Sequence, residues 1–277
     1  MVTMLNMLSI LLLSLPVGFL GSLTGLGGAS ILVPLLVSLG IPVKEAIASG
    51  MVTIIATSSG SASSYVREGI ANVKVAMYLE MFTIVGAIIG ATITILIAPL
   101  YLYFFFAVFL ATSFLKFKGF DKKAPLTHQD KLSKWLKLKG NYFDEAIGET
   151  VKYKVNNALL GGAGMLVAGL AAGMLGIGAG AFKVTVQESI LGLPPKVSST
   201  TSNFIIGMTA LGGTSVYLLS GLLNLTLMGP MAIGTTIGAV LGGRVLNRLG
   251  DRTLRILFFM IVTFLIAQML YKGVRSI

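Results

Sequence analysis

Two glycine-rich stretches decide how this chain folds. Residues 18–28 read Gly-Phe-Leu-Gly-Ser-Leu-Thr-Gly-Leu-Gly-Gly, and residues 169–180 read Gly-Leu-Ala-Ala-Gly-Met-Leu-Gly-Ile-Gly-Ala-Gly. Gly18, Gly25 and Gly27 of the first half recur as Gly169, Gly176 and Gly178 in the second. After a one-residue insertion, Gly86 and Gly90 recur as Gly238 and Gly242. Chance explains single glycine matches but not one register held through most of each half. The pattern indicates a tandem duplication, and internal repeats are typical of transporter folds.

The composition places the duplicated chain in a membrane. Of its 277 residues, 55% are hydrophobic and 11% are charged, and the mean hydropathy is +0.90. Soluble domains carry about 25% charged residues, so this chain lacks the polar surface that water requires. The net charge of +11 does not indicate a nucleic-acid partner, because the Lys and Arg stand at the ends of apolar segments, as in cytoplasmic loops. The sequence predicts a multi-pass integral protein of the cell membrane, in contact with the lipid bilayer.

Conventional active-site chemistry has few residues available. The chain has no Cys, which excludes disulfides, thiolate metal sites and thiol nucleophiles. His128 is the only histidine, so histidine metal clusters and His-based triads cannot form. We therefore expect no enzyme activity, no cofactor and no metal site.

Apolar runs divide into two groups of five, separated by a polar stretch. They cover residues 5–24, 29–40, 46–65, 73–97, 100–116, 155–175, 180–193, 198–219, 225–247 and 253–271. We predict an N-terminal membrane repeat over 1–116, a basic cytoplasmic loop over 117–153 and a C-terminal membrane repeat over 154–277. The expected fold class is an all-α polytopic membrane protein, and the loop carries at most a short amphipathic helix near Lys131–Lys139.

The charge of matched turns indicates that the two repeats are inverted. With the central loop in the cytoplasm, the turn that holds Arg67 and Lys74 falls inside, and its uncharged counterpart at 220–225 falls outside. The uncharged turn at 97–100 falls outside, and its counterpart at 244–255, which holds four Arg, falls inside. Opposite charge at matched turns is what the positive-inside rule requires of an inverted duplication.

The second apolar run of each half is too short to cross the membrane. Residues 29–40 and 180–193 do not reach across ~30 Å of hydrocarbon at ~1.5 Å per residue. Each run follows a glycine-rich turn, Thr24–Gly28 or Gly176–Gly180, so we expect a broken or re-entrant glycine hairpin in each half, near mid-membrane and facing the other. A helix that begins there directs N–H groups and its positive dipole end toward an anion. Close helix packing is the alternative. Packing is the better explanation of the other glycines in apolar runs, Gly86, Gly90, Gly234, Gly238 and Gly242.

Charged side chains inside apolar segments point to function. Lys183 lies three residues after the second turn, where its ammonium can join the helix N–H groups around a negative substrate, and its first-half counterpart is Leu32. The alternatives are a lysine that snorkels to the interface, or a structural ion pair with Glu188 or Glu80. Glu80 and Glu188 are also candidate proton carriers for a coupled transporter.

Small polar residues follow each hairpin and complete the candidate site. Hydroxyl and amide groups bind an anion without fixing its identity, and they also cap helices or join neighbouring ones. Ser198 and Ser199 suit helix capping, whereas Ser202 and Asn203 lie one helical turn further along the chain and are the better candidates for binding the anion. The candidate substrate-binding residues are Thr24, Gly25, Gly27, Gly28, Ser49, Thr53, Gly176, Gly178, Gly180, Lys183, Thr201, Ser202 and Asn203.

These motifs resemble the TauE/SafE sulfite exporter family, also called the sulfonate uptake permease family. Family members carry a duplicated glycine hairpin that leads to Val-Pro and then to a run of small residues with Thr and Ser. Here the first half has Gly25–Pro34 followed by Ala48 and Ser49, and the second has Gly176–Val184 followed by Thr200–Gly207.

The resemblance covers both halves of the chain but not 117–153. Two residues depart from the family pattern: Thr185 stands where Pro is usual, and Ala179 interrupts the usual glycine triplet. The resemblance implies transport of small sulfur-containing or organic anions, with a substrate that varies widely inside the family.

We therefore predict a secondary transporter that moves a small anion by alternating access between the two glycine hairpins. Because the cell interior is negative, each unit of anionic charge that leaves gains ~2.3 kcal/mol per 100 mV, so export needs no coupled ion whereas uptake does. Few buried carboxylates are available for coupling, which favours export; proton- or Na⁺-coupled uptake is the alternative. A passive anion channel and a membrane-embedded enzyme are the other classes. A homodimer is compatible with the sequence.

Overall fold

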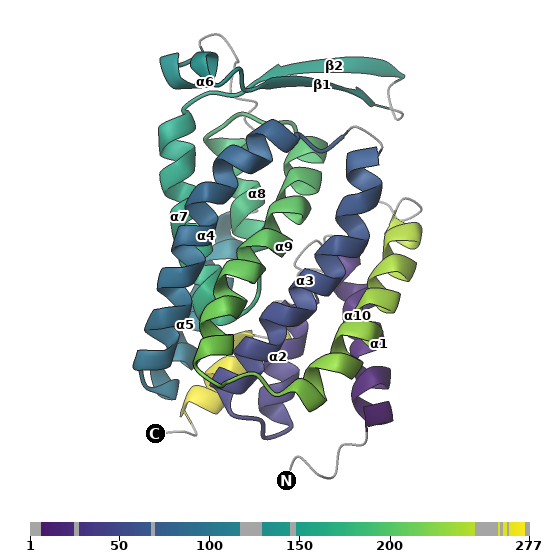
Figure 1. Cartoon of the computed structure of the whole chain (residues 1–277), viewed down its shortest axis with the longest axis vertical. Helices are drawn as coiled ribbons and strands as arrows, with labels where there is room; N and C mark the ends of the chain where they lie inside the picture. Colours follow the sequence, from purple (N-terminus) through teal and green to yellow (C-terminus); the bar gives the residue numbers. More distant parts are fainter. Residues whose placement is uncertain are drawn as a thin grey trace.

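The computed structural model of the chain describes residues 7–24, 28–67, 70–116, 129–144, 148–246, 260, 263–264 and 266–274. Its long helices lie side by side, and a two-stranded hairpin lies across one end of them (Figure 1). The elements are α1 Met7–Thr24, α2 Ala29–Ser38, α3 Val43–Arg67, α4 Val73–Leu96, α5 Pro99–Lys116, α6 Lys131–Trp135, β1 Lys139–Asp144, β2 Glu149–Lys154, α7 Ala158–Leu175, α8 Gly180–Ser189, α9 Pro195–Leu219 and α10 Leu225–Leu246.

The helices follow the apolar runs of the sequence. Each run from 5–24 to 225–247 coincides with a helix, whereas most of the run at 253–271 lies outside the described residues. Within the part of the chain that the structure describes, four helices are long and apolar enough to cross a membrane. They are Val73–Leu96, Ala158–Leu175, Pro195–Leu219 and Leu225–Gly242. The prediction of a mostly helical membrane protein is confirmed.

The short second segments are shorter than expected. α2 and α8 have 10 residues each, which at ~1.5 Å per residue is about half of the ~30 Å hydrocarbon core. Neither helix can span a membrane alone, so each depends on the helices packed around it.

In two pairs of helices, the two partners pack closely together along rows of glycine residues. α1 packs along α10, and α4 packs along α7. A Cβ added to Gly18 would collide with the backbone of Thr235, and one added to its match Gly169 would collide with the backbone of Thr83. Small residues allow this backbone contact, which supplies van der Waals packing where lipid offers no hydrophobic driving force.

The matched glycines on the facing helices make matched contacts. A Cβ on Gly86 would collide with the backbone of Leu166 on α7, and one on Gly238 would collide with that of Leu15 on α1. Gly90 and its match Gly242 meet facing backbone in the same way, as does Gly234, which has no glycine counterpart in the first half. The packing interpretation of these glycines is confirmed.

α3 and α9, which hold matching positions in the two halves, run in opposite directions through the bundle (Figure 1). Ser58, toward the end of α3, donates a 2.6 Å hydrogen bond to the carbonyl oxygen of Asn203 near the start of α9. Met51, earlier in α3, lies against Gly213, later in α9. α4 packs on α9 and α10 packs on α3, so each central helix has a matching neighbour from the opposite half.

Elements α6, β1 and β2, called the cap from here on, cover one end of the bundle (Figure 1). β1 and β2 pair antiparallel, with Lys139 opposite Lys154. Tyr142 and Tyr153 on the inner face are buried in a cluster with residues of α4, α7, α8 and α9, whereas both lysines are exposed. α6 confirms the predicted short helix. The two strands were not predicted and are the departure from an all-α fold.

Asn72 ties the cap to the bundle. Its Nδ2 donates to the Tyr153 hydroxyl at 2.9 Å and to the Lys139 carbonyl oxygen at 3.3 Å, while its Oδ1 accepts the N–H of Val75 and caps α4. The N–H of Asn72 donates to Thr201 Oγ1 at 3.1 Å. One residue thus joins the cap, the start of α4 and the start of α9.

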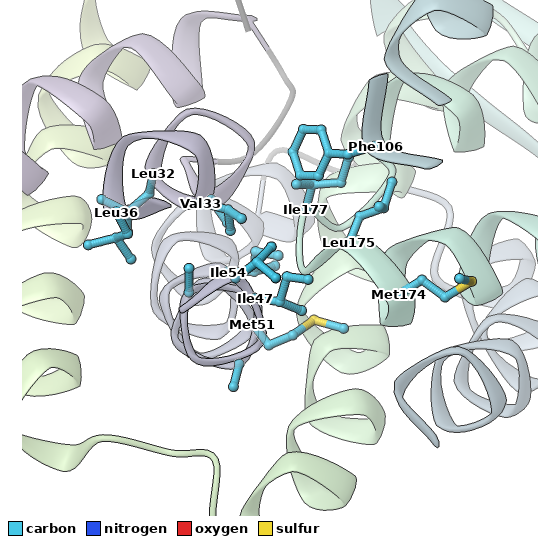
Figure 2. Packing of buried hydrophobic residues seen from close by; sticks show 14 of the residues in the cluster. Leu32, Val33, Leu36, Ile47, Met51, Ile54, Phe106, Met174, Leu175 and Ile177 are labelled. Atoms are coloured by element: carbon cyan, nitrogen blue, oxygen red, sulfur yellow. The ribbon is translucent and has the colours of Figure 1, made fainter. Parts of the chain in front are cut away.

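A hydrophobic core lies where α2, the first half of α3 and the end of α7 meet. Figure 2 shows Val33 of α2, Ile47 and Met51 of α3, and Leu175 at the end of α7 in this core, with Leu32 on the side of α2 farther from Leu175. All of them are at most 1% exposed. This core holds the second glycine turn against α3.

Candidate functional site

α8 begins after a tight turn made by residues 176–179. Gly176 and Gly178 have φ angles of +65° and +69°, a left-handed conformation that glycine adopts at no steric cost. A side chain at Gly176 would collide with the backbone of Ile47 on α3, so the turn lies directly against α3. Residues 176–180 are all buried, and the N-terminus of α8 therefore lies inside the protein.

Lys183 is fully buried one turn into α8, with 0% of its surface exposed. Its Nζ donates a 2.8 Å hydrogen bond to Thr209 Oγ1 on α9, and that oxygen lies 3.1 Å from Thr83 Oγ1 on α4. A lysine ammonium has three donors, and Thr209 is the one acceptor found for it among the residues that the structure describes. Full burial excludes a lysine that snorkels to the membrane surface.

Two further buried polar side chains have unused hydrogen-bonding groups. Glu80 on α4 is 4% exposed and Gln187 on α8, one turn after Lys183, is 0% exposed. Neither the carboxylate oxygens of Glu80 nor the amide atoms of Gln187 have a hydrogen-bond partner in the described part of the chain. Buried polar groups are almost always hydrogen-bonded, and those that are not point to a ligand or a transported species.

Glu80 is the acid that interacts with Lys183. The two groups influence each other electrostatically across α4 and α8, without a hydrogen bond between them. Glu188 is only partly buried, and the structure gives it no interaction with Lys183. Of the two acids, Glu80 is the one whose charge acts on Lys183, although the two groups form no ion pair within 4 Å in the described chain.

The predicted residues of the first half are only partly described. Gly28 is buried at the start of α2, in van der Waals reach of Gly18. The side chain of Thr24, together with Gly25 and Gly27, lies outside the described residues, and with it the expected apposition of the two turns. Ser49 is buried without a hydrogen-bond partner in the described chain, and Thr53 donates a 2.7 Å bond to the carbonyl of Gly50. Ser49 is therefore the first-half hydroxyl with spare capacity.

The predicted polar residues of α9 join structural elements instead of surrounding Lys183. Thr201 accepts the N–H of Asn72, and Ser202 donates a 3.4 Å bond to the carbonyl of Gly180, where α8 begins. The backbone oxygen of Asn203 accepts from Ser58. The structure groups Lys183 with Thr83 and Thr209, one to two helical turns away from these residues.

The expectation that Ser198 and Ser199 cap α9 is wrong. The helix begins at Pro195, and proline is favoured at the first helical position because its missing N–H is not needed there. Ser198 lies inside the first turn and donates a 3.4 Å bond back to the carbonyl of Leu193.

Sequence reasoning missed Thr83, Thr209 and Gln187. The duplication carried a signal for the threonines. In the register that aligns Gly86 with Gly238, Thr83 matches Thr235 and Thr209 matches Thr57, so both positions hold threonine in both halves. Gln187 carried a different signal: it stands four residues after Lys183, which places both on one face of a helix.

The polar cluster belongs to one half of the protein. The positions that match Lys183 and Glu80 are occupied by Leu32 and Ala232, and Leu32 is buried among the apolar residues Ile10, Leu36 and Leu227. The two halves therefore share their packing but not their chemistry.

An open hollow of about 340 Å³ lies at the end of the bundle away from the cap, lined by Glu45 and residues 221–225. Its lining does not include Lys183, Glu80 or Gln187. In the described ranges, no group of three or more His, Cys, Asp or Glu side chains is placed to hold a metal ion.

Apolar helices around a buried ammonium, carboxylate and amide fit a membrane transporter. The chain belongs to the Sulfite exporter TauE/SafE family, whose family model matches residues 10–269. It is similar to the probable membrane transporter protein YunE of Bacillus subtilis (strain 168), 26% identical over 96% of this chain and 98% of that protein. It is also similar to the probable membrane transporter protein YdhB of the same strain, 26% identical over 93% of this chain and 96% of that protein. No solved structure matches the chain significantly.

Proposed function

We propose that this protein is a secondary transporter of small sulfur-containing or organic anions, with its binding site at Lys183 between α4, α8 and α9. The observation that carries the proposal is a fully buried ammonium that has one hydroxyl partner in the described chain. Burying such a charge is costly unless it is paired and hydrogen-bonded. A small oxyanion supplies both the opposite charge and the missing acceptors.

The surrounding groups favour an anion with several oxygens. Lys183 keeps spare donors, and the amide of Gln187 on the same face of α8 offers an N–H₂ with no partner in the described residues. The N-terminus of α8 lies one turn before Lys183 and adds a positive dipole end. Sulfite, sulfonate and carboxylate groups meet these requirements, so charge and hydrogen-bonding capacity select the class of substrate.

We also propose alternating access between two inverted repeats, 1–116 and 154–277, with both glycine hairpins at the membrane midplane. The antiparallel course of α3 and α9 and the equivalent glycine contacts in α1–α10 and α4–α7 support this arrangement. Transporters with inverted repeats bind substrate near the midplane, at short or broken helices, and α8 is such a helix. The proposed direction is export, because the membrane potential drives a net negative charge outward.

Flux measurements test the proposed function. Purified protein in liposomes should take up at least one of sulfite, thiosulfate, sulfoacetate, taurine, sulfate and lactate, and uptake is measured with and without an imposed potential. Protein-free liposomes measure leakage, and single-channel currents would identify a passive channel instead. If no member of the panel enters faster than in empty liposomes, the proposal fails for this class of anion.

Single-cysteine labelling tests the proposed topology, and the absence of native Cys makes it free of background. Cysteines placed in the cap at Lys137 and in the turn at Asn224, both in described segments, should react from opposite sides, with Lys137 in the cytoplasm. The positive-inside rule is the reason, because the cap and its adjoining loop are rich in lysine. Labelling of both positions from one side would contradict the inverted arrangement.

A further inference from the structure

Glu80 is the buried acid that the anion site does not use. Its carboxylate is 4% exposed, has no hydrogen-bond partner among the described residues and interacts electrostatically with Lys183. A carboxylate that only held the fold together would be expected to bond a neighbouring donor, because an unpaired buried charge is destabilising. The charge of Lys183 acts on Glu80, yet Lys183 bonds Thr209 instead.

The charges that reach Glu80 from its neighbours are few. α7, which packs along α4, carries no ionisable residue, and α9 carries Lys196 and Tyr217 at its two ends. Tyr217 is committed to the carbonyl of Gly173 at 2.6 Å, and on α4 itself Tyr78 donates to the carbonyl of Ala158. On α8, Glu188 stands beside Gln187 without an interaction with Glu80, so Lys183 is the charged group that the structure couples to it.

This inference rests on the proposed function and concerns the charge of the site in each step of transport. With no substrate, ionised Glu80 balances Lys183 and the buried site is neutral. With a monoanion bound and Glu80 still ionised, two negative charges face one positive charge away from water. Net buried charge is costly in a low-dielectric interior, so the loaded site is favoured when Glu80 is protonated.

We propose that Glu80 takes up one proton as the anion binds and releases it as the anion leaves, so that the two cross the membrane together. On one side the Glu80 carboxylate accepts a proton from water, and the anion pairs with the Lys183 ammonium. On the other side the anion departs, the Glu80 O–H bond breaks and the proton returns to water. Every charge is balanced in both the loaded and the empty protein. For a monoanion the driving force is then the sum of the anion and proton gradients, whereas a dianion keeps one net negative charge that the membrane potential still drives outward.

Glu80→Gln separates this role from binding. Glutamine has nearly the shape of a protonated glutamate but cannot ionise, so it should permit the loaded site and leave Lys183 unbalanced in the empty one. Exchange of anion for anion needs only the loaded form. Net transport needs the empty form to reorient as well. The variant should therefore exchange anions while losing net flux.

The test uses radioactive methanesulfonate, which stays ionised across the pH range, in liposomes that contain a pH-sensitive dye. Wild type should move one proton with each anion, and a gradient of one pH unit should accumulate the anion about tenfold. Glu80→Gln should retain counterflow near the wild-type rate but show net efflux and pH-driven accumulation lowered about tenfold or more. Glu149→Gln, at an exposed acid of β2, is the control and should behave as wild type in each assay.

Several results would overturn the coupling role. They are pH-driven accumulation by Glu80→Gln, loss of its counterflow with a normal elution profile, and wild-type flux without proton movement. The last measurement needs no variant, so it decides the matter even if Glu80→Gln does not fold. Absence of wild-type counterflow would instead count against the proposed function, at least for sulfonates.

Discussion

Replacing Lys183 by alanine should weaken anion binding by roughly ten- to more than a hundredfold. A hydrogen bond to a charged group contributes ~1.5–3 kcal/mol, and ~1.4 kcal/mol corresponds to a factor of ten in affinity. Competition with the best anion of the transport panel, measured on detergent-purified protein, gives the dissociation constants. Lys183→Arg keeps the charge but has a different reach and a planar donor group, so it should restore binding only in part. The exposed Lys74 of α4 provides the matched control, and Lys74→Ala should bind as wild type.

A purely structural role for Lys183 makes different predictions. If the ammonium only neutralises Glu80, Lys183→Ala should leave a buried carboxylate without compensation and should unfold at a lower temperature. Removing both charges, in Lys183→Ala combined with Glu80→Ala, should then recover folding and transport; if Glu188 were instead the acid that Lys183 neutralises, Lys183→Ala combined with Glu188→Ala should do so. Recovered transport in either double variant would rule out the binding role.

Gly169→Ala should destabilise the protein strongly, although it adds a single methyl group. That methyl would collide with the backbone of Thr83, which cannot move away without separating α4 from α7. Overpacking of this kind costs about 1–3 kcal/mol, which for a chain of this size is a loss of several degrees in Tm. The measurement is the temperature at which the purified protein ceases to elute as a single species.

Gly229→Ala is the matched control for helix packing. Gly229 lies in α10, where a Cβ would meet no atom within 4 Å, so the Tm should stay at or slightly above the wild-type value because alanine favours helix more than glycine does. Gly18→Ala should be as harmful as Gly169→Ala, since the backbone of Thr235 takes the place of Thr83. Equal Tm values for Gly169→Ala and Gly229→Ala would contradict the close packing.

The helices and their glycine contacts could be predicted from the sequence because both depend on local patterns. Apolar runs set the helix positions to within a few residues, and the repeated register of Gly18 and Gly169 marked the faces that touch. Lys183 was identifiable for the same reason, as a charge inside an apolar run. Its partners were not, because Thr209 is 26 residues away and the contact from Thr209 to Thr83 spans 126. Only the crossing of α4, α8 and α9 brings them together.

The cap was missed because its pattern is weak. In β1 and β2 a short alternation of Lys with Tyr, Phe and Val is surrounded by a highly polar stretch, and composition alone indicated a solvated loop. The buried faces of Tyr142 and Tyr153 become meaningful only against the ends of the membrane helices. The start of α9 was misplaced for a similar local reason, since the serine run drew attention away from Pro195.

The most direct test of the central claim is a structure determined with the preferred anion bound. Density for the anion should lie within hydrogen-bond distance of Lys183 Nζ and of the Gln187 amide, between α4, α8 and α9, and it should disappear in Lys183→Ala under the same conditions. Density at another place, with Lys183 still bonded to Thr209 and Gln187 still without a ligand, would contradict the proposed site.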